Sequence, residues 1–143
     1  MFPDSETDSA ASADDAVRRV ARIMVVDDEP DTVITLLELL RAQGYHAEGY
    51  ASGKAALEKL ASFDPDVVIS DIAMPRVNGW DVAREVRQKM GDKRPVLIAI
   101  SGQYTKAADK LLAQLKGFNH YLVKPCDPNI LLSLLGPLAA DLR

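Results

Sequence analysis

The segment DVVISDIAMPRVNG, residues 66–79, carries the pattern on which the predicted fold depends. Its apolar run at 67–69 is typical of a strand that is buried on both faces, and Met74-Pro75 prevents the strand from continuing far beyond Asp71. In an open parallel sheet, ligands bind at the carboxyl ends of the strands. Asp71 would then lie where chemistry is usually done, although an aspartate after a strand is also a common turn residue.

Four other segments have strand character, and helical segments separate them. The predicted strands are 23–26, 45–50, 95–100 and 120–123, and the second of these has the polar alternation of an edge strand. Helix caps are expected at four polar residues, Asp31, Ser52, Asn78 and Asp127. Five strands alternating with five helices predict an α/β fold: a doubly wound, five-stranded parallel sheet with helices on both faces, a three-layer sandwich.

Two helices carry particular expectations. The fourth has an apolar face with helical spacing, made of Ala108, Leu111, Leu112 and Leu115. The last one contains Gly136-Pro137 within its apolar stripe. Because proline lacks the backbone N–H and its ring clashes one turn back, we expect a kink or break near Leu135.

Composition limits the class of protein. With 143 residues and 48% hydrophobic content, the chain suits one domain, which we expect at 21–143 after a disordered acidic tail at 1–20. Five of the 21 acids lie in residues 1–15, which leaves 16 acids against 17 bases and no electrostatic reason to bind DNA or a membrane surface. A single cysteine, Cys126, and no signal peptide or membrane span favour a cytoplasmic protein.

Polar residues follow four of the five predicted strands. They are Asp27 and Asp28, Asp71, Ser101, and Lys124. Parallel strands bring these ends to one edge, where three carboxylates would repel one another unless a cation neutralised them. An all-oxygen set suits Mg²⁺, while lysine and serine suit the oxygens of a phosphoryl group. Asp71, on the central strand, is therefore the predicted nucleophile that forms an aspartyl phosphate.

These motifs resemble those of the receiver domains of bacterial two-component response regulators, which have the CheY-like, flavodoxin-like fold. The resemblance covers about residues 22–143 and rests on VVDDEP at 25–30, ISDIAMPRVNG at 69–79, AISG at 99–102 and YLVKP at 121–125. It implies that Asp71 accepts a phosphoryl group from a phosphohistidine of a sensor histidine kinase or a histidine phosphotransfer protein. It also implies that the chain is not an enzyme acting on an outside substrate.

The resemblance implies a role for each matching residue. Mg²⁺ would be held by Asp28, Asp71 and the backbone carbonyl of Ala73, with Asp27 acting through water. Ser101 and Lys124 would contact the phosphoryl group, and Tyr121 would turn inward when Ser101 moves. The Lys124-Pro125 peptide bond is expected to be cis.

We expect the output to be a change in protein contacts, because the sequence shows no helix-turn-helix, second domain or linker after the receiver. The surface that changes would be formed by the fourth helix, fifth strand and fifth helix, and through it the protein could bind a downstream target or form a weak dimer. Alternatively, the protein could stay a monomer and pass the phosphoryl group on.

Two other functions are open. A haloacid dehalogenase-type phosphatase would need a second acid at position 73, where this chain has Ala73. An interaction module that takes no phosphate would leave the acidic residues unused. Ala73 also offers no polar side chain to position water, which leaves the lifetime of the phosphorylated state open.

Overall fold

The structure is a computed structural model that describes residues 20–103 and 106–140. The predicted tail therefore lies, apart from Val20, outside the described residues. Strands and helices alternate along the chain in this order: β1 Arg22–Val26, α2 Pro30–Ala42, β2 His46–Tyr50, α3 Gly53–Phe63, β3 Val67–Asp71, α4 Gly79–Met90, β4 Val96–Ser101, α5 Ala107–Leu115, β5 His120–Val123 and α6 Pro128–Ala140.

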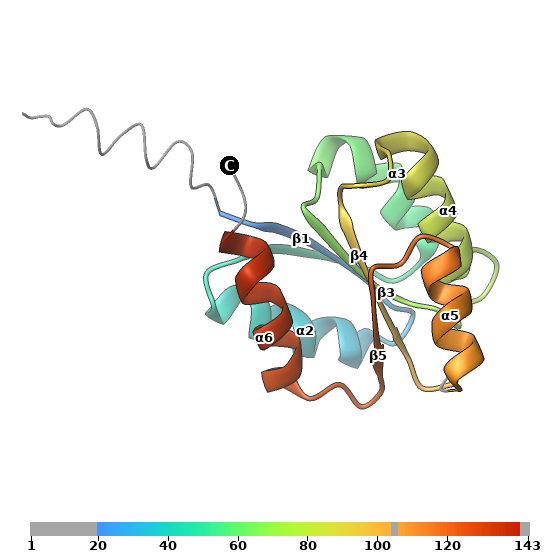
Figure 1. The fold of residues 1–143 in the computed structure, drawn as a ribbon. Helices are drawn as coiled ribbons and strands as arrows, with labels where there is room; N and C mark the ends of the chain where they lie inside the picture. Colours follow the sequence, from blue (N-terminus) through green and yellow to red (C-terminus); the bar gives the residue numbers. More distant parts are fainter. Residues whose placement is uncertain (1–19, 104–105, 141–143) are drawn as a thin grey trace, which may run out of the picture.

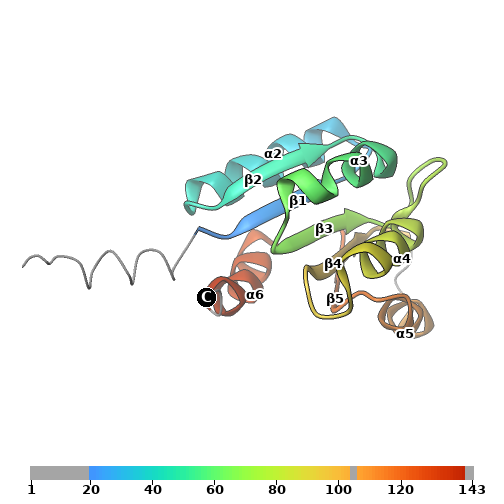
Figure 2. The same ribbon diagram turned by 90° about the horizontal axis from the view of Figure 1, so that it is seen from above.

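The strands form one parallel sheet in the order β2-β1-β3-β4-β5, so β2 is an edge strand as predicted. Helices α2 and α6 cover one face of the sheet, and α3, α4 and α5 cover the other (Figures 1 and 2). This arrangement confirms the predicted doubly wound, three-layer α/β sandwich with five strands and five helices.

Alternation along the central strands divides the core into two layers. In β1, Ile23 and Val25 pack toward α2 and α6, whereas Met24 and Val26 pack toward α3 and α4. All five residues of β3 are buried, as the unbroken apolar run indicated. With both faces covered by helices, the sheet leaves its carboxyl edge as the place where polar groups can gather.

Two predicted caps fix how the helices begin beside this edge. Ser52 accepts a hydrogen bond from the backbone N–H of Ala55 at 3.1 Å, and Asn78 and Asp81 form a capping box. Helix α4 then starts with Gly79, where a Cβ atom would lie 2.5 Å from the carbonyl oxygen of Asp71. Only glycine permits this close contact, which holds the loop after β3 against the end of the strand.

Helix α2 begins two residues earlier than predicted. Pro30 occupies its first turn and Glu29 is the N-cap, so the prediction that Asp31 caps this helix is wrong. Proline is well suited to the first helical position because the N–H that it lacks would have no partner within the helix. Asp31 instead lies in the first turn, where its negative charge interacts favourably with the helix dipole.

The predicted apolar face of the fourth helix, α5, does not pack into the core. Leu111, Leu112 and Leu115 are 58%, 39% and 75% exposed, and the buried residue of this helix is Ala113. Periodicity identifies an apolar face but not what covers it. Here the small Ala113 lets the helix lie close to the sheet, and the leucines face outward.

The last helix does not break. Helix α6 continues through Gly136 and Pro137 to Ala140, so of the kink or break expected near Leu135, the break does not occur. Leu131 and Leu135 are buried against the sheet, and this packing outweighs the single backbone hydrogen bond that Pro137 removes close to the helix end. At the other end, Asp127 accepts a hydrogen bond from the backbone N–H of Asn129 at 2.8 Å, in agreement with its predicted capping role.

Helices α2 and α6, with 13 residues each, are the longest in the described part of the chain, and none found there could cross a lipid bilayer.

Candidate functional site

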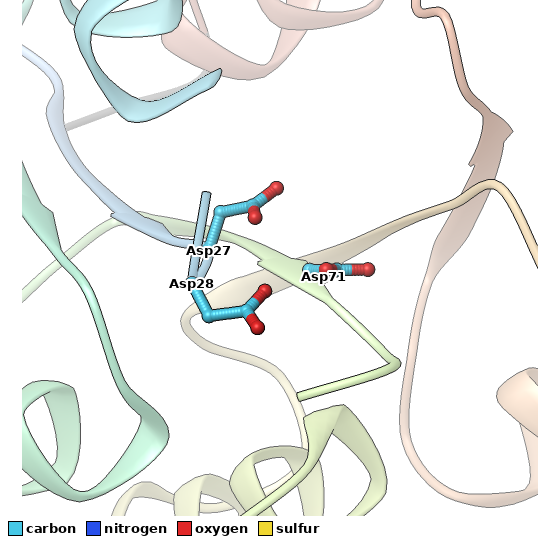
Figure 3. Close-up of side chains that lie close together, drawn as sticks. All are labelled: Asp27, Asp28 and Asp71. Atoms are coloured by element: carbon cyan, nitrogen blue, oxygen red, sulfur yellow. The ribbon is translucent and has the colours of Figure 1, made fainter. Parts of the chain in front are cut away.

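Three carboxylates meet at the carboxyl edge of the sheet. Asp27 and Asp28 follow β1, Asp71 ends β3, and one oxygen from each lies within 4.8 Å of those of the other two (Figure 3). Asp27 and Asp71 are buried, whereas Asp28 is exposed to solvent. The adjacent strands β1 and β3 bring together groups that are more than forty residues apart in the sequence.

Lys124 crosses the edge from the end of β5 to these acids. Its Nζ atom lies 2.8 Å from Oδ2 of Asp27, 3.1 Å from Oε1 of Glu29 and 3.4 Å from Oδ2 of Asp71. Burial disfavours the lysine charge, but the hydrogen bonds to Asp27 and Glu29 and the nearby negative charges outweigh it and raise the pKa of Lys124. The lysine is therefore a fixed positive charge beside Asp71.

The buried position of Asp71 makes its charge costly. Burial, followed by repulsion from Asp27, raises the pKa of Asp71 from 3.8 to about 6, although Lys124 and a backbone hydrogen bond from Ala73 act in the opposite direction. One lysine thus fails to neutralise the carboxylates around it. At neutral pH, Asp71 is still mainly ionised and can act as a nucleophile.

The donor set fits a hard divalent cation. Two buried carboxylates and one exposed carboxylate supply only oxygen ligands, and the exposed Asp28 leaves room for bound water. Mg²⁺ prefers such a site, in which one or two carboxylates, several waters and a phosphate oxygen complete its octahedron. A cation here would also offset the repulsion that raises the pKa of Asp71.

An open cleft lies above the acids, with a volume of about 400 Å³. Asp28, Glu29, Asp71, Ala73, Gly102, Gln103 and Lys124 line it. Asp71 thus faces a space that is open to a small phosphorylated group or to a side chain of a partner.

Ser101 lies at the end of β4 and is fully buried, outside the residues that line the cleft. Its Oγ accepts a hydrogen bond from the backbone N–H of Gln103 at 3.2 Å, and its carbonyl oxygen accepts one from the backbone N–H of Lys124 at 3.0 Å. The structure therefore joins Ser101 to Lys124 through the backbone.

Tyr121 is on β5, and its ring packs against the core layer under α3, α4 and α5. Its hydroxyl oxygen is buried. Beyond the end of this strand, the Lys124-Pro125 peptide bond is cis, as expected. The Arg94-Pro95 peptide bond, for which we made no prediction, is cis as well.

Sequence reasoning missed two residues of the site. Glu29 supplies one of the three carboxylates on Lys124, and Gln103 lines the cleft and contacts Ser101. Glu29 could have been found, because it is the third acid of the DDE run after β1. Lys124 lowers the pKa of Glu29, first through their hydrogen bond and then through its charge.

Taken together, the edge places a buried carboxylate, a positively charged lysine and a cluster of carboxylate oxygens that could hold a cation around one cleft. A phosphoryl group bonded to Asp71 would lie beside the positive charge of Lys124. No second acid stands at position 73, where a phosphatase of the haloacid dehalogenase type would carry its general acid or base.

Comparisons with known proteins agree with this geometry. The family described as the response regulator receiver domain matches residues 23–135. The chain is 33% identical over 112 residues to the DNA-binding response regulator MtrA of Mycolicibacterium smegmatis, an alignment that covers 78% of this chain and 47% of MtrA. It is 29% identical over 119 residues to the chemotaxis protein CheY of Thermotoga maritima, and this alignment covers 82% of this chain and 97% of CheY.

Among solved structures, chemotaxis protein CheY4 of Vibrio cholerae superposes with a TM-score of 0.78 at 29% identity, and the match covers 84% of this chain and 99% of CheY4. The chain therefore spans about half the length of MtrA but almost all of the two chemotaxis proteins.

Proposed function

The chain belongs to the family of response regulator receiver domains of two-component signalling, and from this premise we propose that Asp71 is its phosphoacceptor. The donor would be a phosphohistidine on a sensor histidine kinase or a histidine phosphotransfer protein. The observation that carries the proposal is the position of Asp71, which faces an open cleft between Lys124 and the carboxylates of Asp27 and Asp28.

In the reaction, an ionised oxygen of Asp71 attacks phosphorus. A phosphorus–oxygen bond forms, the phosphorus–nitrogen bond of the donor breaks, and the imidazole leaves with the electron pair of that bond and takes up a proton. Lys124 attracts the phosphoryl oxygens in the crowded transition state and in the product. Asp71 needs no general base, because its pKa of about 6 leaves it mainly ionised at neutral pH.

Asp27, Asp28, Asp71 and the backbone carbonyl of Ala73 are the groups that would hold Mg²⁺. When bound, this ion supplies positive charge to the phosphoryl oxygens. Asp28 is exposed and can accept a hydrated ion from solvent. Asp27 is buried, and hydrogen bonds from Lys124 and from the backbone N–H of Glu29, the latter at 2.9 Å, fix its position.

Phosphorylation adds a charge of roughly −1.5 to −2 to Asp71. Lys124 and Ser101 are joined through the backbone, so a shift of either toward the new group would move the end of β4 relative to β5. Tyr121, on β5, would change its packing in response. This is the switch that we expect to change the output surface.

The output surface would be the outer side of α5, β5 and α6. Exposed apolar side chains lie on each of these elements: Leu111, Leu115, Val123 and Ile130, which are 58%, 75%, 40% and 55% exposed. Exposed apolar residues of this kind suit contacts with a downstream protein or with a second copy of the chain in a weak dimer. We propose that the chain acts in the cytoplasm and as a single receiver domain, without binding DNA itself.

A phosphotransfer profile tests this function. Each histidine kinase and phosphotransfer protein of the source organism is labelled with radioactive phosphate and mixed with the wild-type chain or with Asp71→Asn in Mg²⁺. We expect rapid transfer from one or a few donors to the wild-type chain and none to the variant. Equal labelling of Asp71→Asn would reject Asp71 as the acceptor, and no transfer from any donor would favour a phosphate-independent interaction module.

A further inference from the structure

In the resting structure, three carboxylates surround the ammonium group of Lys124. An ammonium group carries three donors, and the three carboxylates around Nζ, those of Asp27, Glu29 and Asp71, account for all of them. If Asp71 is phosphorylated, as proposed above, the donor that now points at Asp71 can pass to the phosphoryl group, and a second contact from Nζ to that group requires Lys124 to release either Asp27 or Glu29.

Burial decides which acceptor is released. The side chain of Asp27 is 4% exposed and makes the shortest contact, 2.8 Å, so losing Lys124 would leave a buried carboxylate without its cation. The side chain of Glu29 is 64% exposed, and water can replace the lysine at little cost. Glu29 is therefore the acceptor that leaves most easily.

Local contacts hold Glu29 ready for this exchange. The hydroxyl of Thr32 donates to the same oxygen, Oε1, at 3.3 Å, and the backbone N–H of Glu29 donates to Oδ1 of Asp27 at 2.9 Å. The carboxylate is thus placed over Lys124 by the first turn of α2. It also lines the cleft that an anionic donor must enter.

We propose that Glu29 is an exchangeable counter-ion of Lys124, a positioning residue that occupies the lysine in the resting state and gives it up when Asp71 carries a phosphoryl group. Glu29 competes with the phosphoryl group for one N–H donor. It therefore sets how readily the resting protein accepts an anionic group, and its release carries the change at Asp71 to the beginning of α2.

Beryllofluoride, which bonds to a carboxylate oxygen and imitates a phosphoryl group, is the probe. Its affinity is measured by calorimetry in Mg²⁺ for the wild-type chain, for Glu29→Gln and for the matched control Asp31→Asn. The control removes an exposed carboxylate from the same helix turn that is not among the ion pairs of Lys124. We expect Glu29→Gln to bind about twofold to fivefold more tightly, as the strength of an exposed ion pair indicates, and Asp31→Asn to bind like the wild type.

Two further readouts separate exchange from a general charge effect. In the wild type, the carbon-13 resonance of the Glu29 carboxyl group should shift when beryllofluoride binds, and that of Asp31 should not. Unchanged affinity in Glu29→Gln, an equal gain in Asp31→Asn or an unmoved Glu29 resonance would overturn the proposal. If the wild type and Glu29→Gln both fail to bind beryllofluoride and to take label from acetyl phosphate, the proposed function itself fails, and this inference with it.

Discussion

Replacing Asp71 with asparagine should stabilise the fold at neutral pH when no divalent cation is present. Burial and repulsion from Asp27 raise the pKa of Asp71 from 3.8 to about 6. A raised carboxyl pKa means that ionisation costs more in the folded than in the unfolded chain, by about 1.4 kcal/mol for each pH unit of the shift. Because the cleft is open to water, we discount this cost to about 1–2 kcal/mol, which asparagine would remove.

The stability gained by Asp71→Asn should depend on pH in a defined direction. Above about pH 6, Asp71 is ionised in both states and the full cost is present; between about pH 6 and 3.8 the folded chain binds a proton first, and the cost disappears. The advantage of Asp71→Asn should therefore be largest near neutral pH and small near pH 4. Millimolar Mg²⁺ should stabilise the wild type more than the variant and so reduce the difference.

Urea denaturation, followed by the fluorescence of the single tryptophan, Trp80, measures these free energies in EDTA and in Mg²⁺ at several pH values. Asp31→Asn is the matched control, and its unfolding free energy should not rise, because the substitution removes a charge that interacts favourably with the helix dipole. The reasoning is refuted if Asp71→Asn is less stable than the wild type at neutral pH in EDTA, or if its gain does not depend on pH.

Three further substitutions test other parts of the account. Arg87→Met should lower the unfolding free energy by about 2–3 kcal/mol, measured in urea, because the guanidinium donates to three backbone carbonyls and one side-chain amide that join the loops before β4 and β5. Gly79→Ala should destabilise the chain by about 1–3 kcal/mol and slow labelling of Asp71 by acetyl phosphate, because the added Cβ would lie 2.5 Å from the Asp71 carbonyl oxygen. The control Gly136→Ala, whose Cβ would meet nothing within 4 Å, should neither destabilise the chain nor slow the labelling. Leu115→Lys should change the unfolding free energy by less than about 0.5 kcal/mol yet weaken self-association or target binding in sedimentation experiments, because the side chain is 75% exposed.

The fold and the main site residues could be predicted because they depend on local patterns and one topological rule. Apolar runs and capping residues such as Ser52 and Asn78 located the elements, and the strands' parallel arrangement then required their carboxyl ends to share an edge. Asp71 and Lys124 could thus be expected to meet from the sequence alone, and their atoms lie 3.4 Å apart.

Other features depend on contacts that no local pattern records. The outward position of Leu115 is set by what packs under α5, and the ion pair of Glu29 with Lys124 joins residues from opposite ends of the domain. The continuity of α6 through Pro137 likewise depends on its packing against the sheet rather than on helix propensity. Each of these outcomes depends on tertiary contacts, and in α6 these contacts outweigh a local preference against proline inside a helix.

The most direct test of the central claim locates the phosphoryl group after reaction with acetyl phosphate in Mg²⁺. Borohydride reduction converts an aspartyl phosphate to homoserine, which mass spectrometry of peptides assigns to one position. We predict homoserine at Asp71, dependent on Mg²⁺ and absent when Mg²⁺ is removed by EDTA. Unmodified Asp71 in a sample that took up phosphate, or homoserine at Asp27 or Asp28 instead, would contradict the assignment.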